Sequence, residues 1–409
     1  MRVTHVITRL IIGGAQENTV ASVLGLREKP GVHAQLISGP TAGPEGSLES
    51  ELPSITNGPR SPLMREEGPR GVAEIPLLTI IPELVRPVHP WKDFLALRRL
   101  TVLFREQQPH IVHTHSGKAG VLGRLAAQRA GVPITVHTIH GPSFGDFQGA
   151  LSNCIFRAAE RHAARATTHF VVVAEAMKRK YLATGIGRPE QYSKIFSGFD
   201  LAPFLAARND PQLRARFGLQ PDDIIVGKIA RLFKLKGHDD LFAIASELVR
   251  RCPRMKFLLV GGGEWRERFQ NLAHAINLKR NFVFTGLVSP DEVADLVGIM
   301  DIVVHLSRRE GLPRALPQAL AAARPVVAYD CDGANEVCCD NETGFLLQPG
   351  DLAGLRERLL QLANDPQLRG KFGGRGRQFV QQHFAVGQMV DCLHHLYQNL
   401  AAQRGLHLK

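Results

Sequence analysis

Two cationic side chains follow an apolar run in the second half of the chain. Arg231 and Lys236 lie in the segment Lys228–His238, directly after the run Ile224–Ile229, which is typical of a buried strand. In open α/β sheets, ligands bind at the carboxyl ends of the strands, and a guanidinium together with an ammonium suits a diphosphate there. On composition alone, a solvated basic loop is the simpler interpretation.

A carboxylate lies near a predicted helix start in the run Glu310-Gly311-Leu312-Pro313. We expect Glu310 to close a strand and Pro313 to occupy the first turn of a helix, where proline is favoured. The backbone N–H groups near Gly311 and Leu312 would then face the same pocket as the carboxylate, which can accept hydrogen bonds from sugar hydroxyls. The alternative is an acidic residue that only stabilises the helix dipole.

A pair of glycines, Gly13 and Gly14, follows the first predicted strand, Thr4–Thr8. Glycines at a strand-to-helix turn let the backbone approach a ligand closely, and the N-terminus of the next helix favours an anion. The pattern predicts a phosphate site. It differs from the G-x-G-x-x-G dinucleotide motif, and an ordinary tight turn is the alternative.

Four histidines lie at the expected ends of first-half strands: His113, His115, His137 and His140. Neutral imidazoles at a cleft bind hydroxyls or transfer protons. Their spacing also occurs in metal sites, but no carboxylate or cysteine accompanies them at ligand spacing, so we predict no metal. For any single histidine, a structural role is the usual alternative.

These residues need elements that place them at strand ends. Apolar runs of strand length alternate with helical patterns in both halves, which predicts an α/β protein with parallel sheets. In the first half, strands are expected at Thr4–Thr8, His33–Ser38, Ile111–Thr114, Ile134–Thr138 and His169–Val173. In the second half, they are expected at Ile224–Ile229, Lys256–Val260, Val283–Thr285, Ile302–Leu306 and Val326–Ala328.

The turn-rich segment Lys194–Phe204 marks a domain boundary. The stretch Phe372–Gln403 is helical by pattern and could cross back to the first domain. Residues 40–71 are rich in Gly, Pro, Ser and Glu, which predicts a long flexible loop. The predicted domains are 1–197, 198–380 and a C-terminal helix at 381–409.

Composition excludes several classes of protein. The chain has 409 residues, 44% of them hydrophobic, and a formal net charge of +12, which fits a globular protein of about two domains. No run reaches the roughly 18–20 apolar residues of a membrane helix and the start lacks a signal-peptide pattern, so we expect a cytoplasmic protein. Zinc-finger, basic-zipper and aromatic RNA-binding motifs are absent from the sequence, so no nucleic-acid partner is predicted.

Taken in order, the motifs closely resemble those of family 4 glycosyltransferases, retaining enzymes of the GT-B fold that use nucleotide-activated sugars. The resemblance covers nearly the whole chain and implies two Rossmann-like domains that face a central cleft. It rests on Gly13-Gly14, His140, Arg231 with Lys236-Gly237, Glu310 with Gln318, Val260–Gly263, Phe284–Gly286, Glu336 ahead of Asn341–Leu346, and Pro349–Asp351.

The resemblance implies a role for each motif. Gly13 and Gly14 would face the donor diphosphate and sugar. His140 would lie near the sugar and the acceptor. Arg231 and Lys236 would hold the diphosphate and neutralise the departing nucleotide.

The same resemblance assigns the sugar and base contacts. Glu310 would touch hydroxyls of the donor sugar, with Gly311 and Leu312 adding backbone N–H groups. Gly286 lies in the run Phe284–Leu287, where this family contacts the nucleobase. No cofactor is implied, because the donor is a nucleoside-diphosphate sugar and the leaving charge is stabilised without a metal.

One position departs from the family pattern. The second glutamate, expected to bind the ribose hydroxyls, is Gln318 in this chain. A neutral hydrogen bond contributes about 0.5–1.5 kcal/mol against roughly 1.5–3 kcal/mol for a charged one, so we expect weaker donor binding and a retained reaction. The alternatives are a degenerate nucleotide-sugar-binding protein and an epimerase or phosphorylase of the same fold.

The acceptor is expected to be a sugar or a lipid-linked saccharide, in polysaccharide, glycolipid or cell-surface glycan synthesis. Basic residues beside aromatic ones, at Arg98-Arg99 after Trp91 and Phe94 and at Lys178–Tyr181, are compatible with peripheral contact with an anionic membrane at its inner face. Solvated helix faces explain the same residues equally well.

Overall fold

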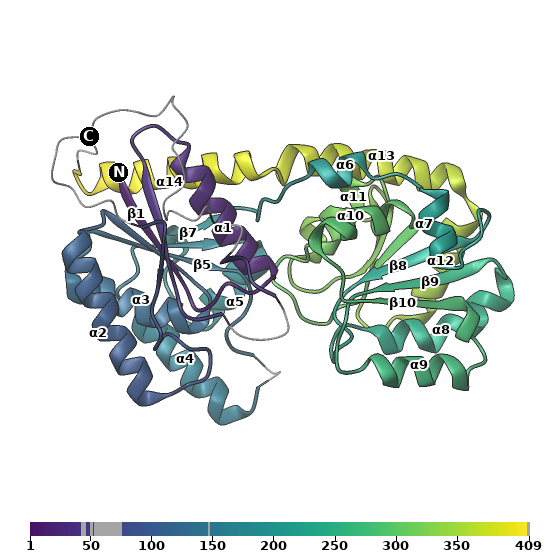
Figure 1. Ribbon diagram of the computed structural model, residues 1–409, viewed down its shortest axis with the longest axis horizontal. Helices are drawn as coiled ribbons and strands as arrows, with labels where there is room; N and C mark the ends of the chain where they lie inside the picture. The colour runs from purple at the N-terminus through teal and green to yellow at the C-terminus, as the bar shows by residue number, and fades with distance from the viewer. Residues whose placement is uncertain (42–45, 50–51, 53–75, 146–147, 407–409) are drawn as a thin grey trace. The chain divides into compact units, whose positions relative to one another are not determined.

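The computed structural model describes residues 1–41, 46–49, 52, 76–145 and 148–406, and the chain divides into two compact units (Figure 1). Unit 1 comprises Met1–Phe199 and Val386–Lys409, and unit 2 comprises Asp200–Ala385. Most of the loop predicted at 40–71 lies outside the described residues. Within them, no helix is both long and apolar enough to cross a bilayer.

Unit 1 is built on a parallel sheet in which the strands follow the order β3-β2-β1-β4-β5-β6-β7. The opening strand β1 lies inside the sheet, and its run Arg2–Ile7 is buried beyond the first residue because neighbours cover both faces. The strand bounds are β1 Arg2–Ile7, β2 His33–Ser38, β3 Leu78–Ile80, β4 Ile111–His115, β5 Ile134–Ile139, β6 His169–Val172 and β7 Tyr192–Lys194.

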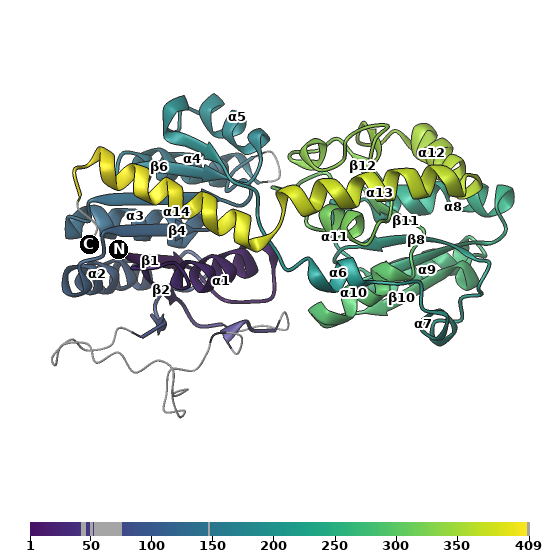
Figure 2. The same cartoon turned by 90° about the horizontal axis from the view of Figure 1, so that it is seen from above.

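Helices cover both faces of this sheet. Helices α1 and α14 lie on one face, and α2, α3 and α4 lie on the other (Figures 1 and 2). The C-terminal helix α14 therefore belongs to unit 1. The helix bounds are α1 Gly14–Arg27, α2 Pro90–Gln107, α3 Gly117–Ala130, α4 Ala150–Ala164, α5 Glu175–Ala183 and α14 Val386–Gln403, with a 3-10 turn at η2 Pro189–Gln191.

The register of this sheet aligns several histidines. His5 of β1 is the partner of His113 in β4, and His115 of β4 is the partner of Thr138 in β5. Alternate residues of a strand share a face. Ile111, of the same parity as His113, packs in the core beneath α1 and α14. The polar side chains of this row therefore lie within the same apolar layer.

Unit 2 is a second parallel sheet, with the strand order β10-β9-β8-β11-β12-β13. Its central strand β8 is flanked by β9 and β11, so the loops after these three strands open at one edge of the sheet. The strand bounds are β8 Ile224–Ile229, β9 Met255–Val260, β10 Phe282–Gly286, β11 Ile302–His305, β12 Val326–Tyr329 and β13 Gly344–Leu347.

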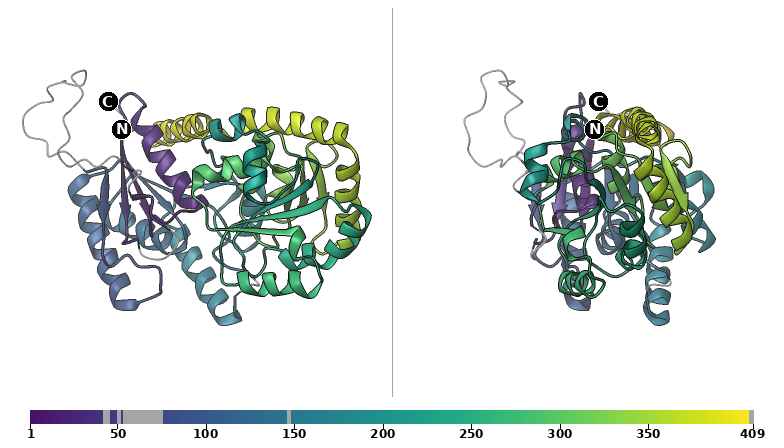
Figure 3. Two further views of the ribbon diagram at one scale, coloured as in Figure 1. Left: turned by 45° about the vertical axis from the view of Figure 1, so that its right-hand side comes forward. Right: turned by 90° about the vertical axis from the view of Figure 1, so that its right-hand side faces the viewer.

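Helices also cover both faces of the unit 2 sheet, with α8 and α9 on one face and α10, α11 and α13 on the other (Figures 1 and 3). A cluster of stacked aromatic rings, including Phe242, Phe257 and Phe282, fills the layer beneath α8 and α9. The helix bounds are α6 Ala202–Ala206, α7 Pro211–Arg216, α8 His238–Arg251, α9 Arg266–Ala275, α10 Pro290–Gly298, α11 Ala315–Ala321, α12 Leu352–Asn364 and α13 Pro366–His383, with 3-10 turns at η3 Lys279–Asn281 and η4 Ala334–Glu336.

One local prediction differs from the structure in this region. The helical stretch Phe372–Gln403 is not continuous, because α13 ends at His383 and α14 begins at Val386. The break matches the division between the units, and the hydrophobic period alone does not reveal it because both helices keep a buried apolar face.

Candidate active site

The ammonium of Lys236 and the carboxylate of Glu310 form an ion pair in unit 2. Lys236 lies in the loop after β8, and Glu310 lies in the loop after β11. The two loops contact each other directly, since the backbone N–H of Arg308 donates to Leu235 O at 2.9 Å. Both side chains of the ion pair keep about one fifth of their surface exposed, at 22% and 21%, so a ligand can reach them.

The surroundings of Glu310 hold its carboxylate ionised. Burial is the largest single influence and by itself would raise the pKa of Glu310, but the charge of Lys236, the neighbouring His305 and hydrogen bonds from Lys236 and Ser307 together lower it. The backbone N–H of Glu310 donates to Asp332 Oδ2 at 2.8 Å, which fixes the main chain. His305 Nε2 lies 3.8 Å from the carboxylate, but burial lowers the pKa of this imidazole to about 3, so it is neutral near pH 7.

Arg231 is an exposed cation at the same edge of the sheet. Its guanidinium carbon lies 5.8 Å from the centroid of the Phe233 ring, and this ring is itself 45% exposed. In the described part of the chain, the guanidinium has no hydrogen bond or ion pair with another side chain. Arg231 is therefore available to an anion.

Gly311 and Leu312 follow Glu310 and are buried. Their backbone N–H groups have no acceptor among the described residues, although Gly311 O accepts from the Gly333 N–H at 3.0 Å. Buried N–H groups are nearly always paired, so two free donors beside a carboxylate mark a place for a ligand.

The predicted strand end and helix start at this loop were wrong. Strand β11 ends at His305, so Glu310 lies further along the loop, and α11 begins at Ala315, so Pro313 precedes the helix. A hydrogen bond within the loop accompanies the shift, because the hydroxyl of Ser307 donates to Arg309 O at 3.2 Å and folds the chain before the helix begins.

Gln318 is half-buried on the short helix α11. Its backbone N–H donates to Arg314 O at 3.2 Å, as expected within a helix. No hydrogen bond of its side-chain amide is found within the described residues. The amide can therefore turn toward a ligand without losing a protein partner.

Gly286 ends β10 in a conformation that requires glycine. Its φ is 80°, and an added Cβ would lie 2.6 Å from Arg266 Nη1. Its carbonyl accepts from the Gly261 N–H at 3.1 Å. An added Cβ on Gly261 would lie 2.4 Å from Ala230 O, so the loop after β9 packs tightly between the segment that carries Arg231 and Gly286.

The sequence analysis missed a buried lysine below this site. Lys228 is 1% exposed on β8, and its ammonium has no hydrogen-bond partner among the described residues. Burial lowers its pKa to about 7, with a further lowering from Lys236. The signal was available, since a charged residue interrupts the apolar run Ile-Ile-Val-Gly-Lys-Ile.

In unit 1, Gly13 and Gly14 lie at the start of α1, in the loop that follows β1. The φ of Gly13 is 175°, which is ordinary extended backbone, so this position does not demand glycine for its dihedral angles. An added Cβ at Gly13 would lie 2.9 Å from Gln16 Oε1, the end of a flexible side chain. Both glycines are partly exposed and offer backbone to a ligand.

The histidines of unit 1 do not share one environment. His140 follows β5 and is partly exposed, whereas His113, His115 and His137 are 0%, 1% and 1% exposed. Burial favours the structural alternative for His113, His115 and His137, whereas His140 remains accessible. The three buried side chains point into the layers on either side of the sheet, because they lie within strands and not beyond their ends.

A further histidine and a tyrosine join this group. His5 of β1 and Tyr397 of α14 are fully buried beside His113 and His115. Neither residue was singled out from the sequence. No local signal pairs them, since they lie at opposite ends of the chain.

Comparison with known proteins places both units in one family. The model of the glycosyl transferase 4-like domain matches residues 13–193, and the model of the group 1 glycosyl transferases matches residues 209–379. The chain belongs to the group 1 glycosyl transferases. Its enzymatic class and its two-domain GT-B fold are therefore those that the sequence resemblance implied.

Curated relatives of this glycosyltransferase are distant but match over most of their length. One from Escherichia coli, named UDP-Gal:alpha-D-GlcNAc-diphosphoundecaprenol alpha-1,3-galactosyltransferase, is 27% identical, covering 79% of this chain and 84% of that protein. Another, the capsular polysaccharide biosynthesis glycosyltransferase CapM of Staphylococcus aureus, is 24% identical over 78% of this chain and 84% of its own.

Solved structures share the fold of this glycosyltransferase. HepE of Anabaena, in complex with UDP-glucose, superposes with a TM-score of 0.78 at 20% identity, over 98% of this chain and 100% of that one. Sucrose-phosphate synthase of Thermosynechococcus elongatus gives a TM-score of 0.76 at 20% identity, with the same shares of the two chains. At this identity the likeness concerns the fold.

Proposed function

We propose that this glycosyltransferase moves a sugar from a nucleoside-diphosphate sugar to a hydroxyl acceptor with retention of anomeric configuration. The observation that carries the proposal is the grouping of Lys236, Glu310 and two unpaired buried N–H groups at one sheet edge of unit 2. This grouping offers both the cations that a diphosphate needs and the acceptor that a sugar hydroxyl needs. Family membership and the ligand named with HepE support the same donor class.

Each group of unit 2 then has a distinct part. Arg231 and Lys236 bind the diphosphate, and the negative charge that develops there as the glycosidic bond breaks is stabilised by both cations. Glu310 accepts hydrogen bonds from hydroxyls of the donor sugar. The Gly311 and Leu312 N–H groups donate to oxygens of the same sugar. Gly286 at the end of β10 and Gln318 on α11 are assigned to the base and the ribose by the family resemblance.

Retention follows from the side on which the acceptor attacks. A double displacement would need a carboxylate nucleophile beside the anomeric carbon. Glu310 is tied to Lys236, and Asp332 accepts from the Glu310 N–H, so neither is placed as a free nucleophile. We therefore propose attack on the face that the leaving group vacates, with the acceptor proton passing to the leaving phosphate.

Gly13, Gly14 and His140 supply the contribution of unit 1. The first two offer backbone N–H groups at the start of α1 to the donor, and His140 contacts the sugar or the acceptor. His140 is neutral near pH 7, because burial lowers its pKa to about 4, so it acts through hydrogen bonding and not through charge.

We propose that the reaction needs no metal cofactor. The two cationic side chains of Arg231 and Lys236 can stabilise the diphosphate leaving group without a metal. Transfer should then persist in excess EDTA. Loss of transfer under EDTA, restored by Mg²⁺ or Mn²⁺, would contradict the proposal.

The acceptor is proposed to be a lipid-linked saccharide, met at the inner face of the membrane by a cytoplasmic enzyme. The support is the diphosphoundecaprenol acceptor in the name of the Escherichia coli relative. On α2, the side chains of Trp91 and Phe94 are 65% and 46% exposed, with Arg98 over the Phe94 ring. The second basic segment contributes less, since its Tyr181 is buried and donates to Ser143 Oγ.

A binding screen tests the donor class. UDP, GDP, ADP and their sugar conjugates are added to the purified protein, and the unfolding midpoint is measured. One nucleotide should stabilise the protein saturably, and Arg231→Ala should abolish the effect. Arg375→Ala, at an exposed position on α13, is the matched control and should respond like the wild type.

The product then tests the reaction. With the nucleotide identified, its sugar conjugate is incubated with a lipid-linked acceptor and the anomeric configuration of the product is read by NMR. Retention is the expected result. An inverted product would overturn the retaining mechanism, and nucleotide binding without any transfer would favour a degenerate binding protein.

A further inference from the structure

A continuous chain of hydrogen bonds runs from His140 into the interior of unit 1. Its members come from β1, β4, α14, and β5 with the residue that follows it. In order along the chain of contacts, they are His140, His115, His5, Tyr397, His113 and Thr138. We call this group the histidine chain.

The first links join rings end to end. His140 Nε2 lies 3.0 Å from His115 Nδ1, and His115 Nε2 lies 2.9 Å from His5 Nδ1. The ring planes of His140 and His115 make an angle of 26°, with the ring centroids 5.3 Å apart. The ring planes of His115 and His5 make an angle of 14°, with the centroids 5.2 Å apart. Such rings share a plane and meet through their nitrogens, so the lone pair of one points at the N–H of the next.

Tyr397 joins the remaining members. Its hydroxyl oxygen lies 2.5 Å from His113 Nδ1 and 3.5 Å from His5 Nε2. Because Tyr397 is fully buried, its O–H needs an acceptor, and His113 Nδ1 lies much nearer to the hydroxyl oxygen than His5 Nε2 does. The Tyr397 hydroxyl therefore donates to His113 Nδ1. His5 Nε2 is left facing the phenol oxygen.

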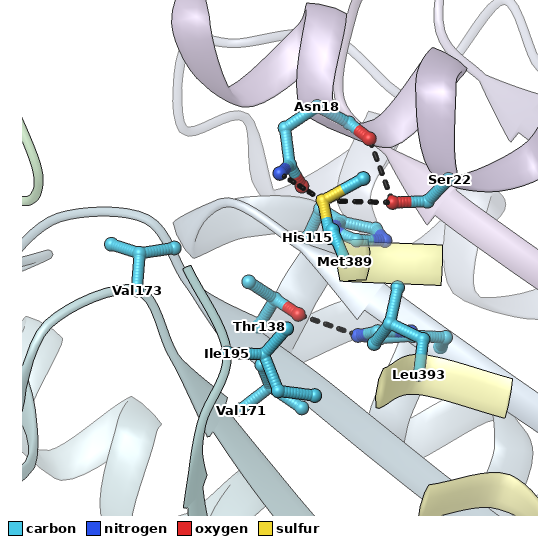
Figure 4. Close-up of a pocket in the computed structure, with 10 residues that line it drawn as sticks. Asn18, Ser22, His115, Thr138, Val171, Val173, Ile195, Met389 and Leu393 are labelled. Atoms are coloured by element: carbon cyan, nitrogen blue, oxygen red, sulfur yellow. Dashed lines mark hydrogen bonds between the residues drawn. The ribbon is translucent and has the colours of Figure 1, made fainter. Parts of the chain in front are cut away.

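The other nitrogen of His113 reaches Thr138 Oγ1 at 2.6 Å. His113 Nε2–H donates there, because its Nδ1 is already an acceptor. Thr138 lines the small pocket of Figure 4, together with Asn18, Ser22 and Met389, so its own hydroxyl hydrogen can turn into that space. A phenol is also more acidic than an aliphatic alcohol, which favours Tyr397 as the donor to His113.

All four histidines of the chain are neutral near pH 7. Burial lowers the pKa of His5 to about 3 and that of His140 to about 4. Burial also takes the pKa values of His113 and His115 well below 6.5. A neutral imidazole has one N–H and one lone pair, so a ring that donates at one end must accept at the other. The direction of one link therefore sets the direction of the next.

The Tyr397 hydroxyl fixes that direction. Since its hydrogen is committed to His113, His5 Nε2 must carry the hydrogen that faces the phenol oxygen. His5 Nδ1 is then a lone pair that accepts from His115 Nε2–H, and His115 Nδ1 accepts in turn from His140 Nε2–H. His140 Nδ1 is left unprotonated.

We propose that Tyr397, on the C-terminal helix α14, fixes the tautomer of His140 so that an unprotonated Nδ1 is offered to a substrate hydroxyl. The role at the hydroxyl rests on the proposed function. His140 is the partly exposed member of the chain, while the other five are buried, so it is the end that a substrate can reach. Tyr397 is a positioning residue, and α14 acts on the reaction through the sheet that it covers (Figure 2).

A metal centre is the competing interpretation of the same rings. Nitrogens of His5, His113 and His115 all lie within 4.8 Å of one another. Each of their six nitrogens, however, already has a hydrogen-bond partner. The rings of His113 and His115 also stack at 4.4 Å and 27°, so their in-plane lone pairs run side by side and do not converge on one point.

Nitrogen-15 NMR of the histidine rings tests the proposal without any substrate. Protein with nitrogen-15 in its histidine rings is examined at about pH 7. The His140 signals are assigned as those that are missing in His140→Gln. The wild type should show a protonated Nε2 and an unprotonated Nδ1. In Tyr397→Phe the direction is no longer fixed, and His140 should show an average of both tautomers.

Tyr192→Phe is the matched control for the loss of a buried hydroxyl. Tyr192 lies in the same unit, is 6% exposed, and donates to Ile186 O at 2.7 Å, away from the histidine chain. Its variant should leave the His140 tautomer unchanged. In a transfer assay, Tyr397→Phe should lower kcat by about 3- to 10-fold with little change in KM, as expected for one lost hydrogen bond.

Several results would overturn the inference. They are a protonated Nδ1 in wild-type His140, an unaltered tautomer in folded Tyr397→Phe, or one Zn²⁺ per chain bound by the three rings. If Tyr397→Phe does not fold, the wild-type spectrum still decides the tautomer. If the enzyme shows no transfer but the spectrum is as expected, the proposed function is contradicted and the tautomer assignment is not. If the enzyme is active but Nδ1 of His140 is protonated, the tautomer assignment is contradicted and the proposed function is not.

Discussion

The ion pair between Lys236 and Glu310 joins the loop after β8 to the loop after β11. In the proposed function, the cation that binds phosphate and the carboxylate that binds the sugar are therefore held by one contact. Substitution of either residue leaves the other without its ion-pair partner. The two substitutions should nevertheless change the affinities for the nucleotide sugar and for the free nucleoside diphosphate in different ways.

Glu310→Gln should separate sugar recognition from phosphate binding. The amide keeps the shape and loses the charge, so binding of the nucleotide sugar should weaken by about 10- to 100-fold, as expected for a charged hydrogen bond. The affinity for the free nucleoside diphosphate should change little. Lys236→Met should weaken both ligands. Calorimetric titration of both variants measures this, and equal effects of Glu310→Gln on both ligands would place the carboxylate away from the sugar.

Gln318→Glu should strengthen donor binding. If Gln318 contacts the ribose hydroxyls, a carboxylate converts a neutral hydrogen bond into a charged one, and the dissociation constant should fall about tenfold. Gln382→Glu, exposed on α13, is the control for an added negative charge and should leave the constant unchanged. An unchanged or raised constant for Gln318→Glu would mean that this side chain does not face the ribose.

Lys228 should make stability depend on pH in the alkaline range. Its folded pKa is lowered to about 7 from 10.5, because burial disfavours the charged ammonium. Between these values the unfolded chain binds more protons, so wild-type stability rises with pH. Lys228→Met removes this dependence. The variant should have the higher free energy of unfolding at about pH 7, and the difference from the wild type should shrink by about 1.4 kcal/mol per pH unit above that pH. Urea unfolding at several pH values checks it, and a constant difference would contradict it.

Acid should unfold unit 1 through its neutral histidines. Burial lowers the pKa of His137 well below 6.5, so below that value the unfolded chain takes up the proton first and stability falls as pH falls. Each such histidine contributes up to about 1.4 kcal/mol per pH unit. His137→Gln should therefore reduce the acid dependence by that amount, whereas the same change at the exposed His33 should not. Equal slopes for both variants would refute this origin.

The buried ion pair of Arg124 and Glu160 should be costly to break from one side. Their side chains are 0% and 2% exposed, and Arg124 Nη2 lies 2.6 Å from Glu160 Oε2. Arg124→Met leaves a buried carboxylate without its charge partner and should lower the free energy of unfolding by about 3–5 kcal/mol. The double variant Arg124→Met with Glu160→Leu should lose much less. Chemical unfolding measures both, and additive losses would exclude coupling.

Local patterns in the sequence were sufficient to predict the two parallel sheets. Strands such as β2 at His33–Ser38 and β8 at Ile224–Ile229 have the predicted bounds, since strands buried on both faces are rich in apolar residues even where single polar residues interrupt them. The same logic predicted that the loops after β8 and β11 carry cations and a carboxylate. It failed at Pro313, because side-chain hydrogen bonds within the loop, and not helix propensity, decide where α11 begins.

The sequence by itself determined the fold class, the family and the residue types at the strand ends, because these depend on neighbours along the chain. Only the tertiary structure decided which distant groups meet. The strand register places His5 beside His113, and the return of α14 brings Tyr397 to both. Burial then lowers the pKa values of these imidazoles and keeps them neutral, which no pattern of sequence spacing encodes.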